Sequence, residues 1–190
     1  MKQIFYIGTL LLGLLSCKSR TVKTVDNVTD HKITADNIKL HKLEKLFVVG
    51  DFDGDGKQDT IFQHNYSRLT KTEIEYSADP FQNEWNTVVK WFNGQDADLY
   101  LTINKSNKDT LRLGTAQGLY CLINVGDNNA DGKEEIAFVI DYLDFSRVNS
   151  CKIYSLCNNK WTLLKQFGVH EGSFDFTTDK TPIFESIEDH

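Results

Sequence analysis

The chain of 190 residues is 40% hydrophobic and 25% charged, and its formal net charge is −6. This composition predicts a folded globular protein with one domain. The acidic balance argues against a nucleic-acid partner, because phosphate binding requires clustered lysine and arginine.

The first residues resemble a bacterial lipoprotein signal peptide. Met1 and Lys2 give a cationic start, and residues 4–15 form an uncharged apolar run that is too short to span a bilayer. The run ends in Leu-Leu-Ser-Cys at residues 14–17, which resembles a lipobox. The resemblance implies a signal peptide of residues 1–16 and a lipid on Cys17. An ordinary cleaved signal with an incidental cysteine is the alternative.

A polar segment follows and predicts a tether over residues 17–42, ahead of a single β domain at 43–190. Residues 37–43 alternate as a strand does, although a short helix is the alternative there. With the lipid, this organisation predicts a protein anchored in the bacterial cell envelope. The expected membrane is the outer one, with the domain facing the periplasm or the cell surface.

Three cysteines remain after the predicted cleavage, at Cys121, Cys151 and Cys157. The oxidising envelope permits one disulfide. Cys151 and Cys157 are expected on one strand, about 20 Å apart, so they cannot pair with each other. Any bridge would use Cys121, and three free thiols are the alternative.

Two segments of the chain repeat with an offset of 76 residues. LFVVGDFDGDGKQDTIFQHN, from residue 46, aligns with LINVGDNNADGKEEIAFVID, from residue 122, with 8 identities in 20 positions. The match continues to Trp85 and Trp161, which suggests a shared packing role. We interpret residues 45–92 and 121–167 as two copies of one supersecondary unit.

The apolar patterns around these segments predict strands throughout. No stretch has a sustained helical period, and the run at 136–140 is continuously apolar, as in a strand buried on both faces. The predicted fold is all-β, with two propeller-blade-like antiparallel sheets and short or no helices. Strands are expected at 46–49, 60–64, 72–76, 86–92, 136–140, 150–156 and 161–167, with a hairpin of 99–103 and 109–113 between the copies.

Both loops place oxygen-bearing side chains at positions 1, 3, 5 and 9, and the backbone carbonyl of position 7 can add a further ligand. An oxygen-only donor set selects a hard cation, and a flexible set of this size suits Ca²⁺ better than Mg²⁺. The second loop has one acid fewer, so weaker binding is expected there. The candidate ligands are Asp51, Asp53, Asp55, Lys57 and Asp59 in the first loop, and Asp127, Asn129, Asp131, Lys133 and Glu135 in the second.

The same spacing has two other interpretations. An EF-hand requires an acid at position 12, where these loops have Phe62 and Phe138. A turn rich in Asp and Gly that binds no ion is the other, since turns favour those residues. Duplication with the spacing preserved argues against it.

The loops and their flanking strands resemble the calcium loops of FG-GAP and VCBS-type repeats, which are integrin-like β-propeller repeats. The shared pattern is an aliphatic strand, G-D-x-[DN]-x-D-G-x-x-D, and a second aliphatic strand. The resemblance implies a calcium-binding hairpin and leaves the partner open. Propellers have about four to eight blades, so two copies predict an abbreviated arrangement and not a closed ring. Small envelope lipoproteins with such loops are similar to this chain.

No familiar catalytic motif occurs in the sequence, which predicts a non-enzyme. The first functional hypothesis is a lipid-anchored module that binds an envelope protein or glycan and uses calcium structurally. Exposed aromatics such as Phe81, Trp85 or Trp91 would touch that partner, unless they lie in the core. The alternative is an inhibitor or immunity-type lipoprotein that blocks an envelope enzyme such as a peptidoglycan hydrolase.

Overall fold

The computed structural model describes residues 37–104, 106–144, 146 and 148–170. The predicted signal peptide, Cys17 and most of the predicted tether lie outside these residues. Antiparallel strands dominate the described part, which confirms the expected all-β class. No helix within the described ranges combines the length and the apolar character that crossing a bilayer would require.

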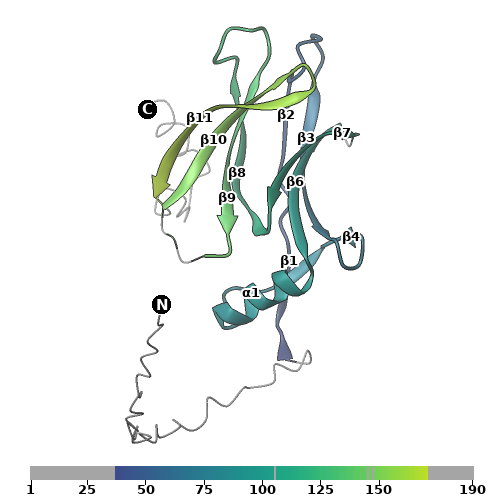
Figure 1. Cartoon of the computed structure of the whole chain (residues 1–190), viewed down its shortest axis with the longest axis vertical. Helices are drawn as coiled ribbons and strands as arrows, with labels where there is room; N and C mark the ends of the chain where they lie inside the picture. The colour runs from purple at the N-terminus through teal and green to yellow at the C-terminus, as the bar shows by residue number, and fades with distance from the viewer. Residues whose placement is uncertain (1–36, 105, 145, 147, 171–190) are drawn as a thin grey trace, which may run out of the picture. The chain divides into compact units, whose positions relative to one another are not determined.

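Two antiparallel meanders form the body of the domain (Figure 1). Each has four strands that pair in chain order, as in a propeller blade, and neither sheet closes on itself within the described residues. The first contains β2 (Phe47–Gly50), β3 (Asp59–Ser67), β6 (Ala97–Ile103) and β7 (Ser106–Gly114). The second contains β8 (Ala116–Gly126), β9 (Glu135–Tyr142), β10 (Val148–Cys157) and β11 (Lys160–His170).

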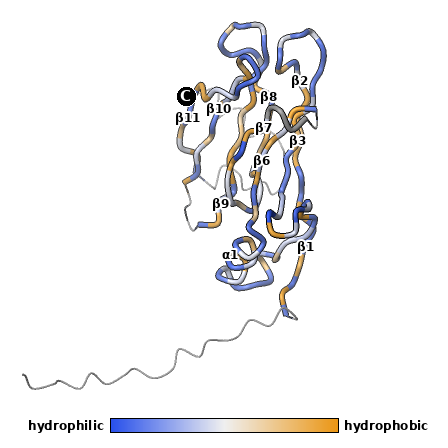
Figure 2. Tube along the Cα trace, turned by 45° about the vertical axis from the view of Figure 1, so that its right-hand side comes forward, coloured by the Kyte–Doolittle hydropathy of each residue, from blue (hydrophilic) through white to orange (hydrophobic). Residues whose placement is uncertain are grey.

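One hydrophobic core joins the two meanders, and Figure 2 shows apolar residues along the strands and polar residues in the turns. Ile61 and Leu101 of the first sheet pack in the same cluster as Phe138 of the second. Strand β9 is buried on both faces, because Phe138 faces this core while Val139 belongs to a second cluster with Cys121 and Cys151. The prediction for residues 136–140 is therefore confirmed.

Residues 68–96 interrupt the first meander between β3 and β6. They contain β4 (Thr72–Glu73), which pairs with β3, β5 (Tyr76–Ala78) and helix α1 (Trp85–Gly94). The strand predicted at 86–92 is thus wrong. Val88 and Phe92 lie four residues apart on one helix face and are fully buried in a small cluster of their own.

The predicted strand near residue 40 is confirmed as β1 (Leu40–Lys42), which pairs with β5 in a separate two-stranded sheet. The alternative of a short helix does not hold over these three residues.

The repeat extends over less of the chain than its sequence match indicated. Strands β2 and β3 correspond to β8 and β9, with the acidic loop between them in both copies. Beyond that point Trp85 begins α1, whereas Trp161 lies on β11 and packs against the main core. The shared packing role suggested for the two tryptophans is wrong. The third and fourth strands of the first sheet are β6 and β7, the hairpin predicted between the copies.

All three described cysteines are free thiols. Cys151 and Cys157 share β10, as predicted. Cys121 on β8 and Cys151 on β10 both pair with Val139 of the strand between them. Two strand spacings, about 10 Å, then separate the two cysteines, which is too far for a disulfide. Burial raises the pKa of Cys121 to about 12 and that of Cys151 to about 11, so both thiols are poor nucleophiles.

Candidate metal centre

The first acidic loop, residues 51–58, connects β2 to β3 and is folded by its own aspartates. The Oδ1 and Oδ2 atoms of Asp51 accept hydrogen bonds from the amides of Gly54 and Gly56, both at 2.9 Å. Oδ1 of Asp53 accepts one from the amide of Asp55 at 3.0 Å. Such side-chain to backbone bonds explain why alternating aspartates produce a tight turn here.

Three of the predicted ligands converge in this loop. Carboxylate oxygens of Asp51, Asp53 and Asp59 lie within 4.8 Å of one another. Asp59 is only 6% exposed, and its Oδ1 accepts a hydrogen bond from the side-chain amide of Asn104. Its Oδ2 is buried and has no hydrogen-bond partner among the described residues. An unsatisfied buried oxygen is costly, and a bound cation would satisfy it.

The structure does not bring Asp55 into this group. Its Oδ2 accepts a hydrogen bond from the ammonium of Lys57 at 2.8 Å, and its Oδ1 accepts one from the amide of Lys57 at 2.8 Å. These two hydrogen bonds lower the pKa of Asp55, and the bond from the Lys57 ammonium has the larger effect. The first loop therefore groups three of its four predicted side-chain ligands.

The second loop, residues 127–134, repeats this construction between β8 and β9. Asp127 accepts hydrogen bonds from the amides of Asp131, at 3.1 Å, and Gly132, at 2.9 Å. Oδ1 of Asn129 accepts a second bond from the amide of Asp131 at 2.9 Å. The ammonium of Lys133 donates to the carbonyl of Leu156 at 3.0 Å, which holds the loop against β10.

A second group of three carboxylates forms here, with oxygens of Asp127, Asp131 and Glu135 within 4.8 Å of one another. Glu135 is fully buried at the start of β9, and its Oε2 accepts a hydrogen bond from the amide of Asn128 at 2.6 Å. Its Oε1 has no hydrogen-bond partner in the described part of the chain. Burial raises the pKa of Glu135, and the hydrogen bond from the amide of Asn128 opposes this rise.

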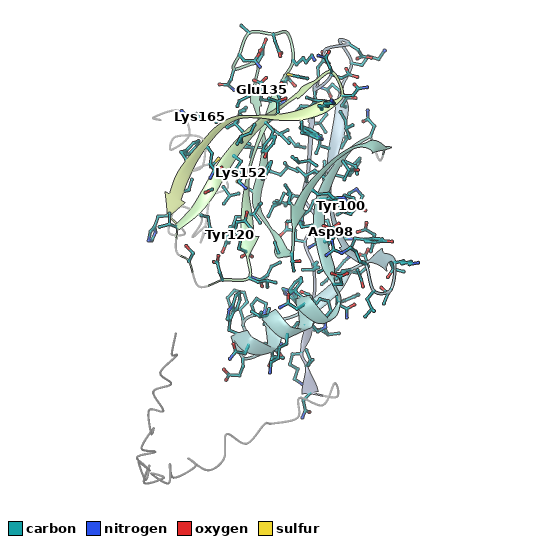
Figure 3. All side chains as sticks on the ribbon, in the orientation of Figure 1. Asp98, Tyr100, Tyr120, Glu135, Lys152 and Lys165 are labelled. Atoms are coloured by element: carbon teal, nitrogen blue, oxygen red, sulfur yellow. The ribbon has the colours of Figure 1, made fainter. Side chains whose placement is uncertain are left out.

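Direct hydrogen bonds join the two loops, which lie at the same end of the meanders (Figure 3, near Glu135). The amide of Asp51 donates to Oε2 of Glu134 at 2.8 Å, and the amide of Glu134 donates to the carbonyl of Asp51 at 2.9 Å. The side-chain amide of Asn124 donates to the same Oε2 at 2.7 Å and to the carbonyl of Val49 at 3.2 Å. We call these four residues the loop junction.

Neither the loop junction nor a second supporting contact is predicted by the sequence pattern. Phe52, the residue after the first ligand, is 1% exposed and belongs to the main core. It anchors the first loop to the body of the domain. The corresponding residue of the second loop, Asn128, instead donates to the carbonyl of Val125 at 2.6 Å. In the sequence, this anchor is indicated by an apolar residue, Phe52, between two aspartates.

Comparison with known proteins assigns no family to the chain. No family model, curated protein or solved structure matches it. The chemistry of the site therefore carries the functional argument. Both groups consist of carboxylates, with no histidine or cysteine among their members, and such groups could hold a hard metal ion.

Backbone geometry within the second loop gives a testable prediction. Ala130 has a φ of 58° at the position where the first loop has Gly54 with a φ of 79°. A left-handed conformation costs a residue with a Cβ about 1–2 kcal/mol, which glycine avoids. We expect Ala130→Gly to raise the free energy of unfolding by about 0.5–1 kcal/mol, because the added freedom of the unfolded chain offsets part of the gain.

The measurement is urea denaturation of the protein in chelator. The matched control is Gly132→Ala, which places a Cβ at a φ of 84° and should lower stability instead. A loss of stability in Ala130→Gly would show that the alanine is not strained.

Proposed function

We propose that this chain is a lipid-anchored, non-catalytic protein of the bacterial cell envelope that holds one Ca²⁺ in each acidic loop. One observation carries the proposal. Each loop ends on an almost fully buried carboxylate, Asp59 or Glu135, with one oxygen that lacks a hydrogen-bond partner in the described structure. Each of these carboxylates belongs to a group of three, whose mutual repulsion a divalent cation would offset.

The donor set favours Ca²⁺ over Mg²⁺. Calcium accepts six to eight oxygens in variable geometry, whereas magnesium demands a near-ideal octahedron and retains several waters. Asp51, Asp53 and Asp59 would hold the first ion, and Asp127, Asp131 and Glu135 the second. Asp55 and the side chain of Asn129 are further donors. The pairing of Asp55 with Lys57 is an exposed ion pair and therefore a weak competitor.

A structural role for the ions follows from the loop junction. The grouped ligands in each site come from one loop, and the two loops bond to each other through Asp51 and Glu134. An ion in either loop would therefore stiffen the junction between the two sheets. Carboxylates that hold a cation remain ionised and cannot serve as general acids, which supports a binding module over a hydrolase. The partner would be an envelope protein or glycan.

Calorimetric titration of the protein with calcium, paired with thermal unfolding, tests this proposal. We expect two binding sites with extracellular-type affinity, and a stabilisation of about 1.4 kcal/mol per site at ten times Kd. Asp59→Asn should remove the first site and Glu135→Gln the second, while the double variant should not respond to calcium. Magnesium at the same concentration should stabilise less.

The matched control is Glu75→Gln, which removes an exposed carboxylate far from both loops and should bind as the parent does. The calcium assignment fails if the parent protein shows neither heat nor thermal shift. It also fails if Asp59→Asn and Glu135→Gln keep the full response.

A further inference from the structure

A cleft of about 660 Å³ lies at the opposite end of β8 and β9 from the acidic loops. It is bounded by the segment after β1, the turn that leads into α1, the start of β8 and the end of β9. Figure 3 shows Tyr120, which lines it, well separated from Glu135 on the same sheet. Its volume falls within the range of small-molecule sites.

The charged side chains among the described residues that line the cleft are carboxylates, and the ammonium of Lys152 lies behind this wall at 3.4 Å from the hydroxyl of Tyr142. Glu44, Asp141 and Asp144 contribute three carboxylates, and His41 contributes an imidazole that bonds to the hydroxyl of Ser77 at 3.0 Å. No lysine or arginine is among the described residues that line it. A charged ligand of this cleft would therefore be a cation.

Four aromatic side chains also line the cleft. They are Phe81, Trp85, Tyr120 and Tyr142. Phe81 is 94% exposed at its edge, which is unusual for a large apolar side chain. Aromatic faces attract ammonium and guanidinium groups electrostatically and also cover the apolar part of such ligands.

Asp141 is the focal charge of the cleft. It lies near the end of β9, partly buried, and accepts hydrogen bonds from the side-chain amide of Gln117 at 3.2 Å and from the hydroxyl of Tyr120. Both donors are neutral, so they orient the carboxylate without neutralising it. Burial raises the pKa of Asp141 to about 6, which is typical of carboxylates at functional sites.

We infer that this cleft binds an organic cation, an ammonium or guanidinium group on an apolar body. Asp141 receives the charged group in a charge-assisted hydrogen bond, and the aromatic side chains cover the apolar body. The cleft contains no residue of the acidic loops, so cation binding there is independent of calcium. The cation could be a free amine or a lysine or arginine side chain of another protein.

Chemical-shift mapping by two-dimensional NMR tests the inference, with the protein titrated in chelator at pH 7.5. The probes are hexylammonium, the tripeptide Ala-Lys-Ala, the neutral and slightly longer alcohol 1-heptanol, and the neutral sugar cellotriose. We expect a cationic probe to bind at least tenfold more tightly than heptanol, with shifts at residues 117–120 and 141–142. Tighter binding of the tripeptide would identify a protein partner, and tighter binding of hexylammonium would identify a free amine.

Variants connect the binding to Asp141. Asp141→Asn should weaken binding of the cationic probe at least tenfold. Glu44→Gln replaces an exposed residue at the rim of the cleft and leaves the core intact, so it should weaken binding about twofold to fivefold. Asp96→Asn, a matched change at an exposed acid outside the cleft, should leave affinity unchanged. Equal binding of heptanol, preference for cellotriose, or unchanged affinity in Asp141→Asn would each overturn the inference.

Discussion

Replacing Gly50 with alanine is expected to lower the free energy of unfolding by about 3 kcal/mol, the combined effect of overpacking and of lost hydrogen bonds. A Cβ at this last residue of β2 would overlap Oε2 of Glu134 and the side-chain amide of Asn124, and would lie 2.8 Å from Cζ of Phe52. The first two groups hold the loop junction, and the third is fixed in the core. None can move aside without losing a contact.

Urea denaturation of the parent and variant measures this effect. The matched control is Gly94→Ala at the end of α1, where an added Cβ meets nothing within 4 Å and no left-handed backbone is involved. That substitution should be neutral or raise stability by up to about 1 kcal/mol, since alanine is the better helix former. If both variants were equally stable, the loop junction would contribute nothing to the fold.

Removing the charge of Asp141 is expected to stabilise the protein at neutral pH. The pKa of this carboxyl is about 6 in the folded protein, raised by burial and further by the charge of Asp144, against an ordinary value of 3.8. The folded state therefore binds the proton more tightly than the unfolded state does. Stability from this group is fully present below about pH 4 and is lost as the pH rises through about 6.

Ionisation of Asp141 therefore lowers the free energy of unfolding by roughly 2–3 kcal/mol at pH 7, since one pKa unit is equivalent to about 1.4 kcal/mol. Asp141→Asn lacks the ionisable group, so its advantage over the parent should be near zero at pH 4 and reach that amount by pH 7. Urea denaturation at both pH values measures the difference. Asp96→Asn should instead lower the free energy of unfolding at pH 7, because the hydrogen bond from Arg68 lowers the pKa of Asp96 in the folded protein. A constant difference between Asp141→Asn and the parent across this range would contradict the prediction.

A carboxylate that weakens the fold at neutral pH needs a reason to be there. Asn at this position would keep the hydrogen-bonding shape without the penalty of burying a charge. Departures from optimal stability concentrate at functional sites. The place of Asp141 in the cleft therefore favours a role in binding over a role in stability.

The sequence was informative where structure depends on near neighbours. The loops could be predicted because Asp51, Asp53 and Asp127 bond to amides no more than five residues away. The doubly buried β9 could be predicted because an unbroken apolar run leaves no polar face for solvent. The calcium assignment remains a prediction drawn from the same spacing.

Other features depend on residues far apart in the sequence and gave no local signal. The helical state of residues 85–94 depends on packing of Val88 and Phe92 against Ile74 and Ala97, which outweighs the strand-like run Thr-Val-Val. The bond between Asp51 and Glu134 spans 83 positions. Neither the insertion that makes room for α1 nor the cation cleft could be read from the repeat.

The shared core has a thermodynamic consequence. In open repeat arrays each unit offers a free face to the next, so units can be added or removed and can melt separately. Here the inner faces of the two meanders bury one another, with Ile61 and Leu101 on one side and Phe138 on the other. Separating the two meanders would therefore expose this main core, although the second meander keeps a smaller cluster of its own around Val139. We therefore expect the two meanders to unfold together in one cooperative transition.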